Sequence, residues 1–380
     1  MPDKANCPKV LFLNLTAFSQ MGGLEKFNRC FLKALNKIEA EGTLISQASS
    51  LYDTTTDERY YPQEKYKGFG RSRIKFVLSG IRRSMKHDVI VLGHINLAIV
   101  GVVAKTIWPR KKLVLITHGI EVWVAASSIQ KMLLAKADKI FAVSEYTRRK
   151  LVEVQGVDER KTALFHNTID PYFPLPNTFG KSGELMRRYG LKESDKVLFT
   201  LCRLSSNEQY KGYDNVIKAM KGLIAKYPEL KYVIAGKYDA IEKERIDLLL
   251  KEYGLTNKVI LTGFVADDEI VAHYQLADVY IMPSKGEGFG IVFIEAMVCG
   301  RRVIAGNKDG SVDALKNGEL GKLVDPENVE DIATSIDTYL SAEPWSSLNA
   351  RQMQNDVMAN FGFEVYQQRL RTLLTTVINN

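Results

Sequence analysis

Two glutamates flank a glycine-rich loop in the segment SKGEGFGIVFIEAMVCG, residues 284–300. Glu287 lies within the loop, and Glu295 lies about two turns into the helix that the following apolar run predicts. The N-terminus of such a helix offers unpaired N–H groups, which bind a phosphate or a sugar hydroxyl. A carboxylate accepts hydrogen bonds from a pair of vicinal hydroxyls. The spacing therefore predicts that one carboxylate faces a sugar and the other reaches a ribose.

A simpler interpretation is that Glu295 is a solvated helix residue and that the glycines only form a turn. We favour a binding site because both carboxylates flank the loop directly after the predicted strand Val279–Met282. With seven residues between them, Glu287 and Glu295 match the E-x7-E motif of retaining glycosyltransferases. The surrounding EGFGIVFIEAM resembles the family-four enzymes, which include bacterial mannosyl- and glucosyltransferases of polysaccharide and lipopolysaccharide assembly.

This resemblance implies an α/β chain with the GT-B fold, in which two doubly wound, Rossmann-like domains face each other across a cleft. It also implies a retaining hexosyltransferase with a nucleotide diphosphate sugar as its donor, of the UDP-glucose or GDP-mannose type. The acceptor would be a saccharide or a lipid-linked molecule of exopolysaccharide or glycolipid assembly.

Other segments extend the resemblance over most of the chain. Gly22 and Gly23 match the family's glycine loop, whose amides approach the donor phosphate; an ordinary strand-to-helix turn is the alternative. His118, in LVLITHGIEVW, matches the active-site histidine near the transferred sugar, although a lone histidine at a strand end is often structural. Arg203 and Lys211 match the basic pair that grips the diphosphate, and two solvated charges are the alternative.

The remaining donor contacts implied by the resemblance lie in two segments. TGFV resembles the family segment beside the nucleobase, and the residues after Glu287 would surround the phosphates and the sugar. Besides Glu295 and the glycine pair, the expected donor-binding residues are Thr262, Gly263, Phe264, Val265, Gly288, Phe289, Gly290, Ile291 and Val292. The loop Asp309–Ala314 also looks like a family loop, but we assign it no chemistry.

The expected reaction breaks a C–O bond to phosphate, and negative charge builds on the departing diphosphate. Arg203, Lys211 and the loop amides would stabilise that charge. Glu287 would hold the sugar hydroxyls, Glu295 would hold the ribose, and His118 would assist on the sugar side. We identify no convincing nucleophile for a double displacement. We therefore expect attack on the same face, with the leaving phosphate oxygen taking the acceptor proton.

Two absent motifs restrict the chemistry further. The sequence holds no Asp-x-Asp motif, so the metal-dependent GT-A architecture is not supported, and we expect no metal ion and no cofactor besides the donor. MGGLEKF stands where a nicotinamide dehydrogenase would carry G-x-G-x-x-G. The alternatives that stay open are a nucleotide-sugar epimerase and a non-catalytic nucleotide-sugar-binding protein on the same fold.

Apolar strands alternate with helices through both halves, which predicts parallel sheets covered on both faces. The expected strands are Val10–Leu15, Val89–Gly93, Leu113–Thr117, Lys139–Val143, Val197–Leu201, Lys231–Ala235, Val259–Leu261, Val279–Met282 and Arg302–Ala305. The Pro-, Asn- and Gly-rich stretch 167–180 predicts a boundary. We expect an acceptor-side domain over 1–172, a nucleotide-sugar-binding domain over 178–358, and a helix over 360–380 that crosses back to the first domain.

Positive charge is concentrated in the first half of the 380 residues. Residues 1–180 hold 27 Lys+Arg and 16 Asp+Glu, a net +11, whereas the remainder holds 25 and 28, a net −3. The segment 65–86 has eight basic residues and no acid, with apolar residues at helical spacing: Ile74, Val77, Leu78, Ile81 and Met85. This pattern predicts a basic amphipathic helix on an anionic membrane surface. A helix packed on its own sheet is the alternative, and nucleic acid is disfavoured because no nucleic-acid motif accompanies the charge.

The sequence also bears on compartment and redox state. No apolar run reaches the ~18 residues that span a bilayer, and the N-terminus lacks the pattern of a secretory signal. We therefore expect a cytoplasmic protein, with its basic segment peripheral on the inner face of the membrane. The four cysteines are widely spaced, which disfavours a disulfide framework or a zinc site.

Overall fold

The computed structural model describes residues 7–379. Their internal contacts form two compact units: unit 1 comprises the chain up to Pro171 together with the segment from Phe361 onward, and unit 2 comprises Tyr172–Asn360. The chain passes from unit 1 to unit 2 within the Pro-rich stretch 167–180. Positions 1–6 of the predicted first domain, and position 380 of the predicted last helix, lie outside the described residues.

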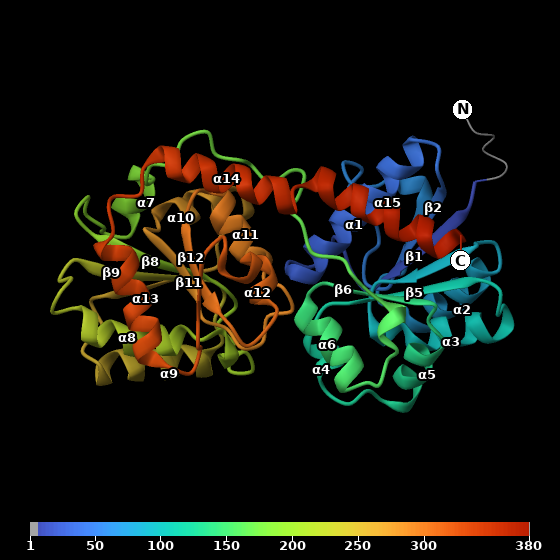
Figure 1. The fold of residues 1–380 in the computed structure, drawn as a ribbon, viewed down its shortest axis with the longest axis horizontal. Coiled ribbons are helices and arrows are strands. Elements are labelled where there is room, and N and C mark those ends of the chain that lie inside the picture. Colours follow the sequence, from blue (N-terminus) through green and yellow to red (C-terminus); the bar gives the residue numbers. More distant parts are fainter. Residues whose placement is uncertain (1–6, 380) are drawn as a thin grey trace. The chain divides into compact units, whose positions relative to one another are not determined.

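Unit 1 is wound around a seven-stranded parallel sheet in the order β3-β2-β1-β4-β5-β6-β7 (Figure 1). Its strands are β1 (Lys9–Asn14), β2 (Ile45–Ser50), β3 (Tyr66–Gly68), β4 (Val89–Leu92), β5 (Lys112–Thr117), β6 (Lys139–Ala142) and β7 (Thr162–Leu164). Its helices are α1 (Gly23–Ala40), α2 (Arg73–Ser84), α3 (Ala98–Ile107), α4 (Ile120–Trp123), α5 (Ser128–Lys136), α6 (Glu145–Glu153) and α15 (Phe363–Asn379). All four residues of β4 are buried, as continuous apolar runs in a covered parallel sheet should be.

Unit 2 is wound around a six-stranded parallel sheet in the order β10-β9-β8-β11-β12-β13. Its strands are β8 (Lys196–Leu201), β9 (Leu230–Ala235), β10 (Val259–Gly263), β11 (Val279–Met282), β12 (Arg302–Gly306) and β13 (Lys322–Val324). Its helices are α7 (Gly183–Arg188), α8 (Tyr213–Leu223), α9 (Ala240–Glu252), α10 (Ile270–Leu276), α11 (Ile291–Val298), α12 (Ser311–Ala314), α13 (Val329–Ser341) and α14 (Ser347–Phe361). Two parallel, Rossmann-like sheets confirm the predicted fold class.

Aromatic side chains hold the C-terminal helix within the core of unit 1. Tyr366 on α15 stacks on Phe165, with ring centroids 4.5 Å apart, and meets Phe27 of α1 edge-on at 6.3 Å. On α15, Leu370 and Leu374 are also buried. Figure 1 shows α15, in red, beside the blue helix α1, although more than 300 residues separate them in the sequence. The last helix is thus part of the first folding unit.

Four of the observed strands were not predicted from the sequence: β2, β3, β7 and β13. The reason is clearest for β2, whose sequence ISQASS has almost no apolar character. Its serines are buried but hydrogen-bonded: Ser46 Oγ lies 2.8 Å from Tyr61 Oη, and Ser50 Oγ donates to the Leu15 carbonyl at 3.1 Å. Hydrogen bonds to distant residues, which no local pattern reveals, replace the missing hydrophobic signal.

The predicted helix over the basic segment 65–86 is shorter than expected. Tyr66–Gly68 form strand β3, and the helix α2 covers only Arg73–Ser84. The apolar residues predicted on one helical face are not all in the same environment. Val77 and Ile81 pack partly against the core of unit 1, whereas Ile74, Leu78 and Met85 are exposed.

Two leucines on the C-terminal helices offer a matched test of this core. Leu370 on α15 has no exposed area, whereas Leu348 on α14 is 79% exposed. Leu370→Ala should lower the free energy of unfolding by about 2–5 kcal/mol, because it removes buried methyl groups and leaves a cavity. Leu348→Ala should change it by no more than about 0.5 kcal/mol. Urea unfolding followed by circular dichroism measures both, and equal effects would mean that α15 does not belong to the core.

Candidate active site

The order of the strands in unit 2 determines where a ligand can bind. β8 and β11 are neighbours, but the chain continues from β8 to β9 on one side and from β11 to β12 on the other. In doubly wound sheets such a reversal leaves a crevice beyond the carboxyl ends of the strands, where ligands bind. The loop after β8 carries Arg203 and Lys211, and the loop after β11 carries Glu287. The topology thus brings these three predicted catalytic residues to one edge of the sheet.

Lys211 and Glu287 form an ion pair at this edge. Lys211 Nζ donates to Glu287 Oε1, and only 14% and 16% of the two side chains are exposed. Burial by itself lowers the pKa of Lys211, but the attraction of the Glu287 carboxylate outweighs it and holds the pKa above its ordinary value. The lysine therefore stays charged at neutral pH, and the pair is largely desolvated before any ligand binds.

Close packing of two backbones positions this pair. Gly212, directly after Lys211, has a φ of 80°, and a Cβ there would lie 2.2 Å from the carbonyl oxygen of Pro283. Only glycine combines this left-handed conformation with so close an approach. The Lys285 N–H donates to the Tyr210 carbonyl oxygen at 3.0 Å. The two loops are therefore joined through their main chains immediately beside the ion pair.

Arg203 has surroundings different from those of Lys211. Its side chain is 73% exposed, and its guanidinium contacts Glu208 Oε1 at 2.5 Å. Asp239, at the N-terminus of α9, anchors the same loop by accepting a hydrogen bond from the Ser206 N–H at 2.8 Å. The predicted basic pair therefore consists of one buried lysine and one solvent-facing arginine. The exposed guanidinium can turn from Glu208 to an arriving anion without a large desolvation cost.

Glu295 is fully buried in the second turn of α11, so the alternative of a solvated helix residue is wrong. Its Oε2 accepts a hydrogen bond from the Tyr274 hydroxyl at 2.9 Å. In this conformation no group outside the protein reaches the carboxylate. Contact with a ribose, as the resemblance implies, requires the side chains around Glu295 to move.

The other predicted donor-binding residues of unit 2 lie in two places. Gly288 to Val292 close the loop and form the first turn of α11, with Gly290 at its N-cap. The Phe289 side chain is buried, so only its main chain is available to a ligand. Thr262 and Gly263 end β10, Val265 is buried, and Phe264 is 54% exposed. Phe264 is thus the member of TGFV whose aromatic ring is exposed, with Lys237 Nζ 5.4 Å from the ring centroid.

In unit 1 the corresponding reversal lies between β1 and β4, and His118 follows the next strand, β5. Its Nε2 lies 2.8 Å from the Gly93 carbonyl oxygen. Because a carbonyl only accepts, Nε2 carries the proton and Nδ1 keeps a free lone pair. Burial lowers the pKa of His118. The imidazole is therefore neutral at pH 7 and can accept a hydrogen bond from a hydroxyl group.

His94 is a neighbour that the sequence reasoning missed. Its ring lies nearly parallel to that of His118, with centroids 6.2 Å apart, and burial lowers the pKa of His94 to about 4. Glu121 completes the group, because its Oε1 accepts a hydrogen bond from the main-chain N–H of His118 at 2.5 Å. The available signal was positional, since His94 follows the carboxyl end of the apolar strand β4.

The predicted phosphate loop of unit 1 is already occupied by carboxylates. Gly22 is the N-cap of α1, and a Cβ there would lie 2.7 Å from Glu25 Oε2. Earlier in the loop, the Ala17 N–H donates to Asp53 at 2.7 Å. A phosphate at this helix N-terminus would meet the negative charge of Glu25. The assignment of Gly22 and Gly23 to the donor phosphate therefore stays a prediction, and it requires Glu25 to turn away.

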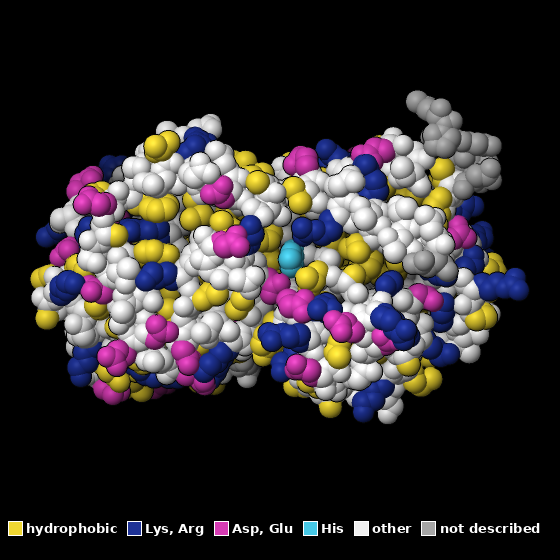
Figure 2. Space-filling view, viewed as in Figure 1, with side chains coloured by type: hydrophobic (Ala, Val, Ile, Leu, Met, Phe, Trp, Pro, Cys, Tyr) yellow, Lys and Arg dark blue, Asp and Glu magenta, His cyan; other side chains and the backbone are white. Residues whose placement is uncertain are grey.

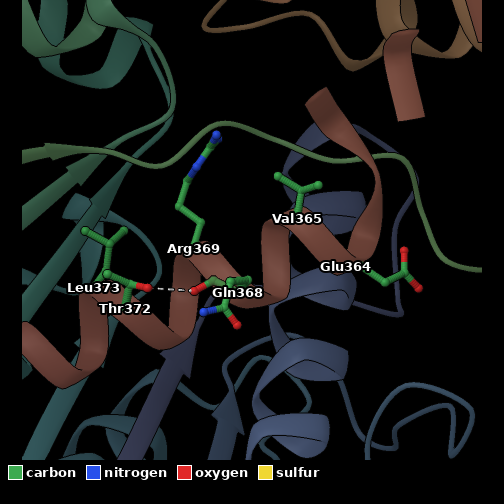
Figure 3. Close-up of a pocket in the computed structure, with 6 residues that line it drawn as sticks. All are labelled: Glu364, Val365, Gln368, Arg369, Thr372 and Leu373. Carbon is green, nitrogen blue, oxygen red and sulfur yellow. Dashed lines mark hydrogen bonds between the residues drawn. The ribbon is translucent and has the colours of Figure 1, made fainter. Parts of the chain in front are cut away.

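A groove of about 580 Å³ lies elsewhere, along one side of α15 (Figure 3). It is lined by Glu364, Val365, Gln368, Arg369, Thr372 and Leu373. Arg369 lies 3.3 Å from His166 Nδ1, and burial lowers the pKa of its guanidinium. None of the predicted site residues lines this groove, and we assign it no chemistry.

Within residues 7–379, no three His, Cys, Asp or Glu side chains are grouped to hold a metal ion. The four cysteines of this range are free thiols, and all but Cys7 are buried.

Two family models match most of the chain. One, described as "Glycosyl transferases group 1", covers residues 182–356 in unit 2, and the other, "Glycosyltransferase Family 4", covers residues 21–173 in unit 1. Together with the two parallel sheets, these matches define the class as GT-B glycosyltransferases. The chain belongs to glycosyltransferase family 4, a retaining family.

Several relatives show what the chain is similar to. It is 30% identical over 260 residues to a GDP-mannose-dependent α-(1-6)-phosphatidylinositol monomannoside mannosyltransferase of Mycolicibacterium smegmatis, a match that covers 64% of this chain and 65% of that protein. It is 29% identical over 217 residues to a D-inositol 3-phosphate glycosyltransferase of Rhodococcus jostii, covering 56% and 47%. The chain thus spans less than two thirds of the length of these curated relatives.

Solved structures share the fold. Anabaena HepE in complex with UDP matches with a TM-score of 0.77 at 20% identity, covering 97% of this chain and all of that one. A glycosyltransferase of Rickettsia africae matches with a TM-score of 0.77 at 19% identity, covering 99% and 100%. At these identities the likeness concerns the fold alone.

The neutral state of His118 can be tested by titration. Because burial lowers its pKa, the imidazole should stay unprotonated as the pH falls through its ordinary value of 6.5. Below that pH the unfolded chain takes up a proton that the folded chain does not, so the folded state loses stability as the pH falls. NMR of ¹⁵N-histidine-labelled protein, with His118→Gln to assign the signal, gives the midpoint. A midpoint at or above 6.5 would contradict a neutral acceptor at this position.

Proposed function

We propose that the protein is a retaining hexosyltransferase that moves a sugar from a nucleotide diphosphate donor to a saccharide or lipid-linked acceptor. The observation that carries the proposal is the buried Lys211–Glu287 pair at the strand-order reversal of unit 2. A nucleotide sugar contains a replacement partner for each of these two groups: a diphosphate for the ammonium group and sugar hydroxyls for the carboxylate. The chain's membership of glycosyltransferase family 4 supports this proposal.

In this mechanism the two charges exchange partners when the donor binds. The diphosphate attracts Lys211 Nζ, and Arg203 can add a bidentate contact from the solvent side. Glu287, released from Lys211, accepts hydrogen bonds from sugar hydroxyls. As the glycosidic C–O bond to phosphate breaks, negative charge grows on the diphosphate, where both cations stabilise it. The acceptor attacks the face that the diphosphate leaves, and the departing phosphate oxygen takes the acceptor proton.

Neutral His118 suits a role in which it accepts a hydrogen bond rather than donates a proton. Its Nδ1 can accept from a hydroxyl of the transferred sugar and so orient that sugar, whereas Nε2 is held by the Gly93 carbonyl. Relatives and solved structures point to two donors. The Mycolicibacterium enzyme is named for GDP-mannose, and a HepE structure holds UDP-glucose. We therefore propose a donor of the GDP-mannose or UDP-glucose type.

The proposal can be tested by a thermal-shift screen against UDP, GDP, ADP and their sugar derivatives. One diphosphate and its sugars should stabilise the protein selectively, by about 2.7 kcal/mol at 100 times the dissociation constant. Arg203→Ala should weaken that ligand about 10-fold or more, because it removes a charge-assisted hydrogen bond. The matched control is Arg160→Ala, since Arg160 is also exposed and paired with a carboxylate, Asp158, but lies in unit 1 directly before strand β7, at the amino edge of the sheet.

Transfer is then assayed with the selected donor, using the release of free diphosphate in the presence of candidate acceptors. Selective binding with no transfer or hydrolysis would favour a non-catalytic binding protein. Interconversion of the donor sugar without release of diphosphate would favour an epimerase. Equal ligand affinities for the Arg203 and Arg160 variants would contradict the placement of the diphosphate.

We further propose that unit 1 binds an anionic membrane surface through α2. Ile74, Leu78 and Met85 are 76%, 64% and 48% exposed, and their spacing places them on one helical face. Exposed basic residues flank this face: Arg71, Lys75, Arg82 and Lys86. Figure 2 shows Lys and Arg side chains interspersed with hydrophobic ones on the part of the surface that unit 1 forms. Within residues 7–379 no helix is long and apolar enough to cross a bilayer, and the proposal concerns surface binding.

Vesicle co-sedimentation tests this surface. The protein should bind vesicles that contain phosphatidylglycerol more strongly than vesicles of phosphatidylcholine alone, and added salt should weaken the binding. Ile74→Ser/Leu78→Ser should reduce binding at least about 10-fold, because each substitution removes exposed apolar area that would enter the interface. Ile241→Ser/Leu248→Ser is the matched control, since these two residues, on α9 of unit 2, are 69% and 59% exposed. Equal loss in both double variants would contradict a site on α2.

A further inference from the structure

The loop after β12 packs directly against the loop that carries Glu287. Asp309, in this second loop, has no exposed area. Its Oδ2 accepts the Glu287 N–H at 2.7 Å, and its Oδ1 accepts the Ser311 N–H at 2.9 Å. In return, the Gly310 N–H donates to the Glu287 carbonyl oxygen at 2.8 Å. Both main-chain polar groups of Glu287 are therefore held by two consecutive residues of one neighbouring loop.

The two loops have no room to shift independently. A Cβ at Gly310 would lie 2.0 Å from the Gly288 carbonyl oxygen, so the backbones are in direct contact there. At the start of the loops, a Cβ at Gly306 would lie 1.9 Å from the Ser284 carbonyl oxygen. A displacement of the Asp309 loop must therefore move the main chain on both sides of Glu287.

The charges around Asp309 come from several elements. Glu287, on the facing loop, repels the Asp309 carboxylate, while Lys211 is directed to Glu287. Lys308, next in the chain, points to Asp325 and Glu327 instead. On α11, which packs against α12, Glu295 is bonded to Tyr274. Among the described residues no cation contacts Asp309, and its carboxylate accepts hydrogen bonds from the backbone N–H groups of Glu287 and Ser311.

We propose that Asp309 is a positioning residue, which fixes the main chain of Glu287 and thereby places the Glu287 carboxylate for the donor sugar. This role rests on the proposed transferase function. The simpler alternative is that Asp309 only caps the short helix α12 through the Ser311 N–H. The two differ in whether the sugar-transfer step depends on the carboxylate, since a cap for α12 has no direct link to Glu287.

The ionisation of Asp309 provides a way to distinguish the two roles, because a purely structural role would not make the turnover rate depend on the protonation of this carboxylate. Burial raises its pKa to about 7, against the hydrogen bonds from Ser311 and Glu287 that favour the charged form. Above that pH the carboxylate accepts both N–H groups. As the pH falls through 7, protonation converts one oxygen to a hydroxyl group and weakens its hold on one of them. The turnover rate should therefore decrease as the pH falls through about 7.

The first variant is Asp309→Asn, which keeps the shape but retains only one acceptor oxygen for two N–H groups. We expect kcat for transfer to fall at least 10-fold and the acid limb near pH 7 to disappear, with the affinity for the free diphosphate changed less than 3-fold. The matched control is Asp325→Asn, whose carboxylate likewise accepts a loop N–H, that of Glu327 at 2.9 Å. It should leave kcat and its pH profile unchanged. Wild-type kcat and pH profile in Asp309→Asn would overturn the proposal.

A second measurement uses the wild-type protein and needs neither substrate nor a folded variant. Hydrogen exchange followed by NMR should show the Glu287 amide protected above pH 7. Its protection factor should drop at least 10-fold by pH 6, after correction for the intrinsic rate. A protection factor that does not change between these pH values would overturn the role of Asp309 even if transfer is observed. Absence of transfer together with the expected exchange pattern would instead count against the proposed function alone.

Discussion

The site in unit 2 depends on one buried ion pair, Lys211–Glu287. Removal of one partner from such a pair costs about 3–5 kcal/mol, because the other charge is left buried and uncompensated. Each charge needs a replacement partner before the pair can separate. A diphosphate and a sugar, joined in one molecule, supply both replacements together. The pair therefore favours a ligand that has both chemical parts.

Much of unit 2 serves to hold this pair. Gly212 allows the lysine-bearing loop to approach Pro283, Asp239 anchors the same loop from α9, and Asp309 holds the main chain of Glu287. These supports come from different segments that meet at the carboxyl edge of one parallel sheet. Electrostatic stabilisation of a leaving group is effective when the charged groups are already in place and partly desolvated, because no reorganisation is then needed during the reaction. The arrangement of unit 2 fits that requirement.

Unit 1 differs from unit 2 in the charge state of its buried polar groups. Burial keeps its His118 neutral, although the hydrogen bond to the Gly93 carbonyl favours the protonated form, and the amide of Ala17 is held by Asp53. Its surplus of positive charge, in contrast, is exposed on the surface, especially around α2. In unit 2, by contrast, the cations Lys211 and Arg203 are each paired with a carboxylate at the carboxyl edge of the sheet.

The amino-acid sequence by itself determined the α/β class, most of the central strands and the candidate residues Glu287, Arg203, Lys211 and His118. These features depend on local patterns, since continuous apolar runs, glycine loops and motif spacing are all read along the chain. Strands such as β2 could not be predicted, because buried serines bonded to distant residues carry no apolar signal. Only the tertiary structure showed that Glu295 is buried against Tyr274, that Lys211 is paired with Glu287, that His94 lies beside His118, and that Asp309 bonds to the Glu287 main chain. Burial and pairing join residues that lie far apart in the sequence, and only the folded chain decides which of them meet.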